Sequence, residues 1–239
     1  MGTPPTLSVV IPVYNEAPYL AEVIAAVKAT GRAGEIWVID DGSTDDTAAI
    51  LARYAGDPVV RTHRLERNSG KGVALRAGFA RATGDVVLVQ DADLEYSPAD
   101  YAALLAPFEQ DATVVYGSRF RGVCEGMRWP NLVANRILAW LANVLYRAGI
   151  TDEATGYKAF RRDLLQSLPL ECRRFEFCPE VTALVRRRGH RIVEVPIHYR
   201  ARTVQQGKKI GWTDGVHAVW TLLRCRFRRL PDAAERSPR

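Results

Sequence analysis

The chain has 239 residues, of which 47% are hydrophobic and 25% are charged, and these ordinary values exclude collagen-like, coiled-coil and wholly disordered proteins. The formal net charge of +6 is uneven, because residues 186–239 carry 14 Lys or Arg and 4 Asp or Glu, whereas residues 1–185 carry the other 19 and 23. No run approaches the roughly 18–20 apolar residues that span a bilayer, and the four cysteines lack metal-binding spacing, which favours reduced thiols in the cytosol.

Short apolar runs rich in β-branched residues alternate with segments of helical periodicity in the first half of the chain. The runs predict strands at residues 7–12, 35–40, 59–63, 85–90 and 113–117. The periodic segments predict helices at residues 18–30, 44–54, 72–83 and 98–108. This alternation predicts an α/β fold with a mainly parallel sheet, in which ligands bind beyond the carboxyl ends of the strands.

The second half of the chain is less regular and more basic. Residues 131–149 and 214–227 have the apolar spacing of amphipathic helices, residues 191–199 form a predicted strand, and residues 229–239 are expected to be a flexible tail. The two helices are expected either to pack on the sheet or a second subunit, or to lie on a membrane. The basic end is expected to meet an anion such as nucleic acid, phosphate or a membrane surface.

Alternate carboxylates follow the predicted strand at residues 85–90. Asp91, Asp93 and Glu95 are oxygen ligands of the kind that Mg²⁺ and Mn²⁺ prefer, and their position at a strand end favours a metal site. The alternative is a solvated turn or a helix N-cap before Pro98.

A second acidic cluster, Asp40 and Asp41, lies at the end of the predicted strand at residues 35–40. Carboxylates at this place can accept hydrogen bonds from a base or a ribose hydroxyl, and Tyr14 and Glu16 at the neighbouring strand end supply an aromatic ring and another carboxylate. Turn and cap chemistry is an equally good interpretation of the segment that follows, Asp-Gly-Ser-Thr.

A Gly/Lys loop at residues 67–72 leads into the third predicted helix. Its sequence, RNSGKG, lacks the GxxxxGK[ST] spacing of a nucleotide-binding P-loop. Its backbone amides and Lys71 can hold an anion at a helix start, or the loop is a solvated turn.

Taken in order, these motifs resemble glycosyltransferase family 2, and within it the dolichyl-phosphate mannosyltransferases and the bacterial polyprenyl-phosphate glycosyltransferases. The resemblance covers residues 6–228 and is carried by VIPVYNE at 10–16, DDGSTD at 40–45, GKG at 70–72, DAD at 91–93, GSR at 117–119, TGYKAF at 155–160, RFEF at 174–177 and EVPI at 194–197. It implies a GT-A fold, Rossmann-like, with C-terminal amphipathic helices at a membrane interface. It also implies one domain over residues 1–228, with a nucleotide and metal half at about 6–120 and an acceptor half at about 121–228.

The resemblance also implies roles for individual residues. The nucleotide sugar would be held by Pro12, Tyr14, Glu16, Asp40, Asp41 and Lys71. A Mg²⁺ or Mn²⁺ ion would be held by Asp91, Asp93 and Glu95. The acceptor phosphate would meet Arg119, Arg136, Arg202, Lys208 and Lys209. Catalysis would depend on Asp91, Asp93, Arg119 and Arg202. The family's Gly-x-Ser-Lys acceptor loop is replaced by QQGKK at residues 205–209, which leaves that loop's contacts open.

The implied reaction is the metal-dependent, inverting transfer of a hexose, of the mannose or glucose type, from a GDP- or UDP-sugar to a polyprenyl phosphate. The expected location is the cytosolic surface of a membrane, without a spanning segment and without nucleic acid as a partner. Three alternatives compete with this hypothesis: transfer to a saccharide or soluble acceptor, nucleic-acid binding by the basic end, and an inactive nucleotide-binding scaffold.

Overall fold

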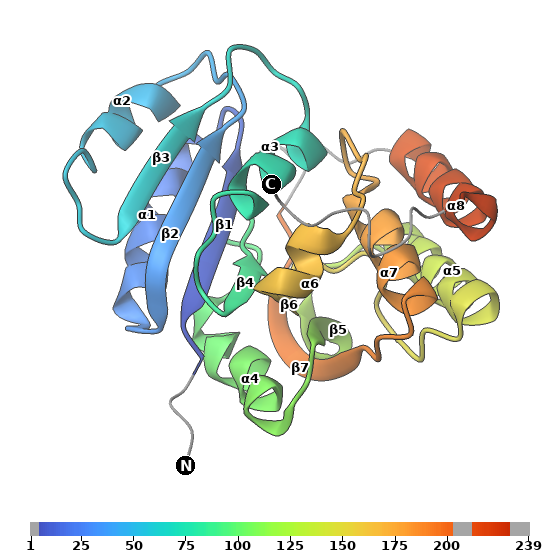
Figure 1. The fold of residues 1–239 in the computed structure, drawn as a ribbon. Helices are drawn as coiled ribbons and strands as arrows, with labels where there is room; N and C mark the ends of the chain where they lie inside the picture. Colours follow the sequence, from blue (N-terminus) through green and yellow to red (C-terminus); the bar gives the residue numbers. More distant parts are fainter. Residues whose placement is uncertain (1–4, 203–211, 230–239) are drawn as a thin grey trace.

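A seven-stranded sheet forms the centre of the molecule in the computed structural model, which describes residues 5–202 and 212–229 (Figure 1). Its strand order is β3-β2-β1-β4-β6-β5-β7. The strands are β1 Leu7–Val13, β2 Ala33–Asp40, β3 Val60–Arg64, β4 Val86–Val89, β5 Val114–Glu125, β6 Lys158–Arg161 and β7 Val193–Arg200. β1 pairs in parallel with β2 and β4, and β2 with β3, so the predicted mainly parallel sheet is confirmed.

β6 is a strand that the sequence pattern did not predict. It lies antiparallel between β4 and β5, whereas β5 and β7 are parallel. β6 begins at Lys158, which is fully buried: its ammonium donates a hydrogen bond to the Glu153 carbonyl (2.7 Å) and lies 3.7 Å from the centre of the Tyr116 ring. A four-residue strand that starts on a buried lysine has no apolar run to reveal it.

The helices differ from the predicted ones mainly at their ends. They are α1 Ala17–Ala29, α2 Thr47–Ala52, α3 Lys71–Phe79, α4 Tyr101–Leu105, α5 Trp129–Tyr146, α6 Arg162–Ser167, α7 Phe177–Arg187 and α8 Trp212–Phe227, with 3₁₀ turns η1 Pro98–Asp100 and η2 Ala106–Gln110 beside α4. Of these, α6 and α7 were not predicted. The helix predicted at residues 98–108 is divided into η1, α4 and η2, in keeping with the prolines in the first turns of η1 and η2.

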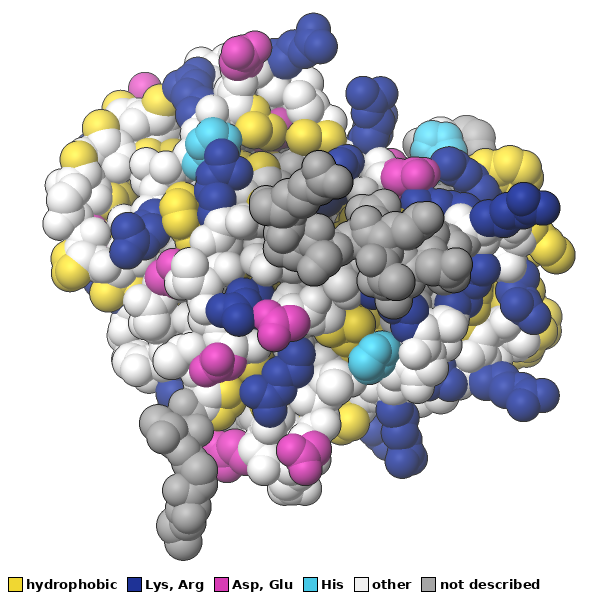
Figure 2. All heavy atoms as spheres, viewed as in Figure 1, with side chains coloured by type: hydrophobic (Ala, Val, Ile, Leu, Met, Phe, Trp, Pro, Cys, Tyr) yellow, Lys and Arg dark blue, Asp and Glu magenta, His cyan; other side chains and the backbone are white. Residues whose placement is uncertain are grey.

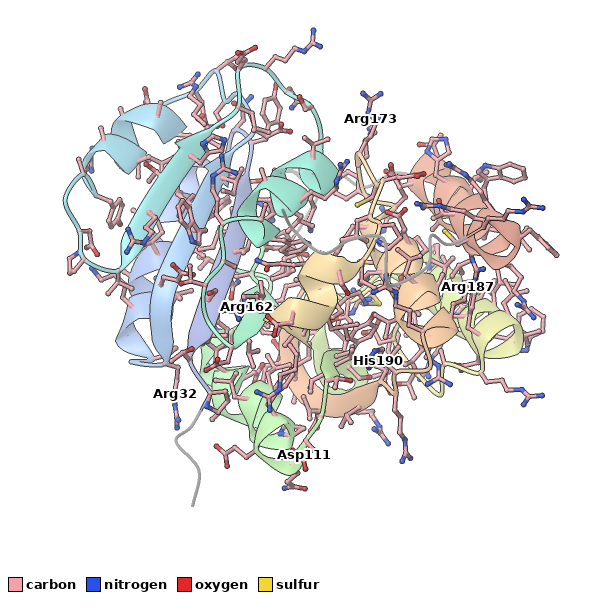
Figure 3. All side chains as sticks on the ribbon, in the orientation of Figure 1. Arg32, Asp111, Arg162, Arg173, Arg187 and His190 are labelled. Carbon is pink, nitrogen blue, oxygen red and sulfur yellow. The ribbon has the colours of Figure 1, made fainter. Side chains whose placement is uncertain are left out.

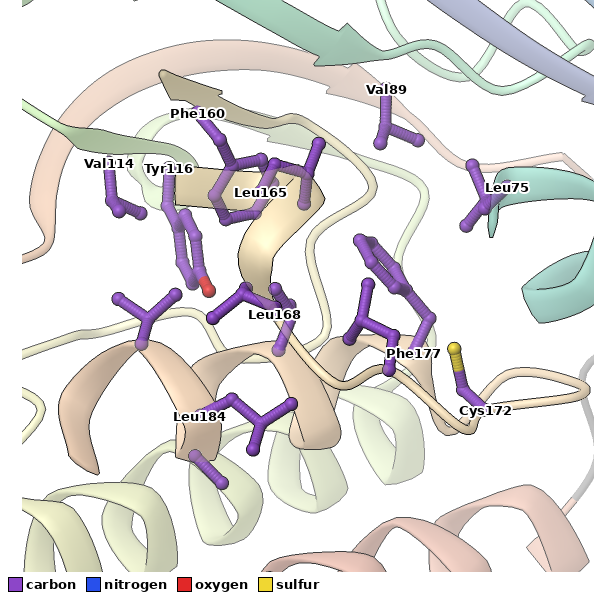
Figure 4. Packing of buried hydrophobic residues seen from close by; sticks show 14 of the residues in the cluster. Leu75, Val89, Val114, Tyr116, Phe160, Leu165, Leu168, Cys172, Phe177 and Leu184 are labelled. Atoms are coloured by element: carbon purple, nitrogen blue, oxygen red, sulfur yellow. The ribbon is translucent and has the colours of Figure 1, made fainter. Parts of the chain in front are cut away.

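Two apolar clusters cover the two faces of the sheet. Alternate residues of β1 belong to different clusters: Val9 and Ile11 pack with α1 and α4, whereas Val10 packs with α3 and α7. Figure 4 shows the cluster that contains Val10, in which Phe160 of β6 and Phe177 of α7 lie among aliphatic side chains. Burial on both faces explains why strands such as β4 are continuously apolar.

α5, α7 and α8 form a helical group beside the sheet (Figure 1). The Tyr146 hydroxyl donates a hydrogen bond to the Leu222 carbonyl (2.5 Å), and the Arg187 guanidinium donates one to the Cys225 carbonyl (2.6 Å). Leu222 and Cys225 are buried, so α8 packs on the body of the protein along one side. The packing interpretation of the two amphipathic helices therefore accounts for one face of each.

Candidate functional site

A cleft of about 490 Å³ lies beyond the carboxyl ends of β1, β2 and β4, where the topology predicts a ligand site. Most of the predicted site residues line it: Pro12, Tyr14, Glu16, Asp41, Lys71, Asp91, Asp93, Glu95 and Arg202. Asn68, Arg174 and Phe175 also line the cleft, and no role was predicted for any of these three residues. The structure therefore gathers segments that lie up to 190 residues apart in the chain, as measured from Pro12 to Arg202.

The turn after β1 is fastened to the turn after β2. The backbone amide of Asn15 donates to the Ser43 hydroxyl (3.0 Å), and the Asn15 side-chain oxygen accepts from the Thr44 amide (2.8 Å). Asn15 has a φ of 52°, a left-handed conformation that Asn tolerates better than most residues. These bonds fix the backbone on either side of Asn15, so that Tyr14 and Glu16 both face the cleft.

The two carboxylates at the end of β2 have different tasks. Asp40 is 1% exposed and accepts a hydrogen bond from the Ser43 amide (2.8 Å), which is the turn chemistry considered as the alternative for this segment. Asp41 accepts hydrogen bonds from the amides of Ser69 and Gly70, both at 2.8 Å. Burial raises the pKa of Asp41 even though these two bonds act to lower it. Among the described residues that line the cleft, Asp41 is present and Asp40 is not.

The amides of Ser69, Gly70 and Gly72 in the Gly/Lys loop already have partners within the protein. The Ser69 and Gly70 amides donate hydrogen bonds to the Asp41 carboxylate. The Gly72 and Val73 amides donate to the Arg173 carbonyl, at 2.9 and 3.3 Å. An anion held by these backbone amides would have to displace those bonds. The Lys71 side chain lines the cleft and is the cationic group that this loop offers to an anion.

Lys71 and Asp91 form an ion pair across the cleft floor. Burial acts to lower the pKa of the Lys71 ammonium, but the Asp91 carboxylate outweighs it and the pKa is raised. Lys71 is therefore a cation in the cleft at neutral pH.

Asp93 pairs with Arg202. The Arg202 guanidinium donates to the Asp93 carboxylate (2.7 Å) and to the Glu16 carboxylate (3.0 Å), and so ties the ends of β4, β1 and β7 together. Burial, followed by the negative charges of Asp91 and Glu95, raises the pKa of Asp93 to about 7. The carboxylates are thus crowded in a partly dehydrated place, which favours an additional cation.

The Glu95 side chain points to the end of β7 and not to the carboxylates of Asp91 and Asp93. Its oxygens accept hydrogen bonds from the Arg202 amide (2.7 Å) and the Tyr199 hydroxyl (3.1 Å). In residues 5–202 and 212–229, no three His, Cys, Asp or Glu side chains converge as a metal site. Mg²⁺ is commonly held by one or two carboxylates together with substrate phosphates, so Asp91 and Asp93 alone fit such an ion. In this structure the Glu95 carboxylate instead holds the backbone of Arg202.

Arg119 and Arg136 are not brought to the cleft. Arg119 is 5% exposed, and its guanidinium donates two hydrogen bonds of 2.7 Å to Asp152, which is itself fully buried. Arg136 lies exposed on α5 over the Phe120 ring, 4.4 Å from its centre. Neither appears among the described residues that line the cleft. The remaining predicted phosphate contacts, Lys208 and Lys209, lie outside the described residues.

Comparison with known proteins places this arrangement in a family. The family model for glycosyl transferase family 2 matches residues 8–168, which include Lys71 of the Gly/Lys loop and the carboxylates Asp91 and Asp93. The chain belongs to glycosyl transferase family 2. The undecaprenyl-phosphate 4-deoxy-4-formamido-L-arabinose transferase of Salmonella paratyphi A is 32% identical over 212 residues, which are 84% of this chain and 62% of the relative. The chain therefore spans a little under two thirds of that protein.

Two further relatives extend the comparison of this family 2 chain. The polyprenol monophosphomannose synthase of Mycolicibacterium smegmatis is 31% identical over 213 residues, 85% of this chain and 80% of the relative. The glucosyl-3-phosphoglycerate synthase of Mycobacterium tuberculosis, in a complex with Mn²⁺, UDP and phosphoglyceric acid, matches with a TM-score of 0.73 and 26% identity, over 95% of this chain and 80% of that one. The predicted family and GT-A fold are confirmed.

Gly156 of this family 2 chain is a site residue whose role the sequence did not reveal. It lies against one cleft carboxylate, because a Cβ at this position would lie 2.6 Å from a carboxylate oxygen of Asp91. Its amide donates to the buried Tyr96 hydroxyl (2.9 Å), which fixes the close approach. The motif at residues 155–160 was the only sign of it, and a motif alone does not say which side chain it faces.

Gly156→Ala is expected to reduce sugar transfer by about 100-fold, because the added methyl displaces the Asp91 carboxylate by roughly an ångström. The measurement is the initial transfer rate together with the thermal unfolding midpoint. Gly34→Ala is the matched control, since a Cβ there makes only an ordinary contact at 3.5 Å. Equal transfer rates in the two variants would contradict the placement of Asp91.

Proposed function

We propose that this chain transfers a hexose from a nucleoside diphosphate sugar to a polyprenyl phosphate. The observation that carries the proposal is the cleft itself, in which Asp91 and Asp93 at the end of β4 face Lys71 and Arg202. The names of the relatives support the acceptor class, because one acts on undecaprenyl phosphate and another makes polyprenol monophosphomannose.

Asp91 and Asp93 would hold a Mg²⁺ or Mn²⁺ ion, which would supply positive charge beside the departing diphosphate. The cleft lining supports a hard cation, since its acidic side chains outnumber its basic ones and offer only oxygen ligands. A solved relative that binds Mn²⁺ together with UDP supports the same assignment.

The reaction needs little help from a general base. A phosphate monoester loses its second proton near pH 6, so the acceptor oxygen is already an anion at neutral pH. A bond forms between that oxygen and the anomeric carbon while the bond from this carbon to the diphosphate oxygen breaks, and one displacement inverts the configuration. The problem is to hold two anions together, and Lys71 and Arg202 bring cationic groups to that place.

A membrane surface is the proposed place of the acceptor. α5 and α8 carry apolar side chains that remain exposed although the helices pack against each other: Trp129, Ile137, Trp140 and Val144 on α5, and Val216, Trp220 and Phe227 on α8. Figure 2 shows Lys and Arg side chains gathered over the side of the molecule that carries α5, α7 and α8, with hydrophobic side chains at its edge. Apolar residues with a basic surround suit an anionic lipid surface.

In the described parts of the chain, no helix is both long enough and apolar enough to cross a bilayer. We propose that these helices lie on the cytosolic face of the membrane.

Trp140→Glu is expected to weaken binding to phosphatidylglycerol-containing liposomes by about 30-fold, since burial of an indole contributes about 2 kcal/mol. Trp140 is 62% exposed, so the substitution leaves the core intact. Flotation through a density gradient measures the bound fraction, with and without anionic lipid. Val123→Thr is the control, because Val123 is an exposed apolar residue that belongs to β5 and to neither helix. Unchanged flotation of the Trp140 variant would contradict the membrane assignment.

The decisive test of the proposed function is a panel of radiolabelled donors, UDP-glucose and GDP-mannose among them, offered with undecaprenyl phosphate with and without Mn²⁺. A metal-dependent lipid product with inverted anomeric configuration is expected. A soluble phosphomonoester is the second candidate acceptor, because the structural relative binds phosphoglyceric acid. Adding 3-phosphoglycerate to the panel separates the two, since transfer to it alone would replace the lipid acceptor.

A further inference from the structure

The charged side chains that line the cleft are unequally engaged. Among the described lining residues, the acids are Glu16, Asp41, Asp91, Asp93 and Glu95, and the bases are Lys71, Arg174 and Arg202. Lys71 is paired with Asp91, and Arg202 is paired with Asp93 and Glu16. Arg174 differs from both, because within residues 5–202 and 212–229 its guanidinium makes neither an ion pair nor a hydrogen bond.

The backbone that carries Arg174 is held firmly in place. The Glu180 carboxylate accepts hydrogen bonds from the amides of Glu171 (3.0 Å) and Cys172 (2.7 Å), and the Glu176 carboxylate accepts one from the Arg173 amide (2.8 Å). An exposed side chain on a backbone fixed at three successive amides is positioned before any ligand arrives.

The same loop lies directly against the Gly/Lys loop. The Arg173 carbonyl accepts from the Gly72 amide (2.9 Å), and a Cβ on Gly70 would lie only 2.3 Å from that carbonyl and 3.2 Å from the Arg174 Cγ. Gly70 has a φ of 100°, which together with this close approach requires glycine. The stem of Arg174 therefore packs beside the residue that precedes Lys71, at the rim of the cleft.

We propose that the Arg174 guanidinium binds a phosphate group in this cleft. The proposal rests on the proposed function, which requires a diphosphate and a phosphate monoester to meet there. In this structure Lys71 and Arg202 are each paired with carboxylates, whereas Arg174 adds an uncommitted fork of N–H donors, the geometry that matches a phosphate. The phosphate belongs either to the nucleotide or to the acceptor, and the two sources are separated by experiment.

The test compares Arg174→Gln with Arg173→Gln. Arg173 is the matched control, because it is the neighbouring arginine and points away from the body of the protein in Figure 3. Its contacts to α3 are made by the backbone and survive the substitution. Calorimetric titration with UDP and GDP in the presence of Mn²⁺ measures the nucleotide arm, and titration with farnesyl phosphate measures the acceptor arm.

Arg174→Gln is expected to weaken the binding of one of these ligands by at least about tenfold, since a charge-assisted phosphate contact contributes that much. Arg173→Gln is expected to leave the affinities unchanged. A loss for UDP or GDP assigns the contact to the donor, and a loss for farnesyl phosphate assigns it to the acceptor. Arg174→Lys keeps the charge without the fork and is expected to lose less. If the unsubstituted protein binds the nucleotide or farnesyl phosphate, and Arg174→Gln binds these ligands with unchanged affinity, this inference is wrong while the proposed function stands. If the unsubstituted protein binds neither nucleotide nor farnesyl phosphate, the proposed function itself fails.

Discussion

Asp93→Asn is expected to lower the rate of sugar transfer by about 1,000-fold while the chain stays folded. The substitution keeps the size of the side chain and removes its charge, so the carboxylate pair that would hold the metal is lost. Positive charge beside a departing diphosphate contributes several kcal/mol, and about 4 kcal/mol corresponds to a factor of 1,000 in rate. The measurement is the initial rate with the donor and acceptor that the panel identifies.

The control for this variant is Asp111→Asn, which makes the same chemical change far from the cleft. Asp111 is exposed at the edge of the molecule (Figure 3) and has a φ of 63°, a conformation that Asn also accepts. Treatment of the unsubstituted protein with EDTA is expected to reproduce the loss, and added Mn²⁺ to restore the rate. Full activity in EDTA, or in Asp93→Asn, would refute the metal assignment.

The strands and helices could be predicted wherever burial leaves a regular pattern in the sequence. β1 and β4 are buried on both faces, and their continuous apolar runs predicted them to within a residue or two. β6 was missed for a physical reason, because it contains a buried lysine whose charge is accommodated by a carbonyl and a ring. α7 was missed although its apolar residues follow the helical period.

The site could be predicted as a set of segments but not as a set of contacts. Parallel topology is enough to bring Tyr14, Asp41 and Asp91 to one edge of the sheet. Topology does not tell which partner each charge finds. Glu95 meets the Arg202 amide and Arg119 meets Asp152, and both partnerships join segments far apart in the chain that only the packed structure brings together.

Arg119→Met is expected to lower the free energy of unfolding by about 3–5 kcal/mol, because it leaves the buried Asp152 carboxylate without its partner. The pair is enclosed, with Arg119 5% exposed and Asp152 fully buried, so solvent does not screen the loss. Urea unfolding followed by circular dichroism measures the change. A phosphate-binding arginine on the surface would cost less than about 0.5 kcal/mol when replaced, so stability separates the sequence-based role from the structural one.

The double variant Arg119→Met with Asp152→Asn tests whether the unpaired Asp152 charge causes the loss of stability. Asparagine keeps an oxygen that can accept from the Arg119 backbone amide, a bond of 3.0 Å in this structure, while it removes the uncompensated charge. More than half of the lost stability is therefore expected to return, and the coupling between the two positions is expected to exceed about 1.5 kcal/mol. The Arg119 guanidinium also lies 5.1 Å from the centre of the Tyr199 ring, whose hydroxyl donates to Glu95. The double variant loses this contact to a residue that holds Glu95, so it is still expected to transfer sugar slowly. Additive effects of the two substitutions would show that the pair does not hold this part of the fold.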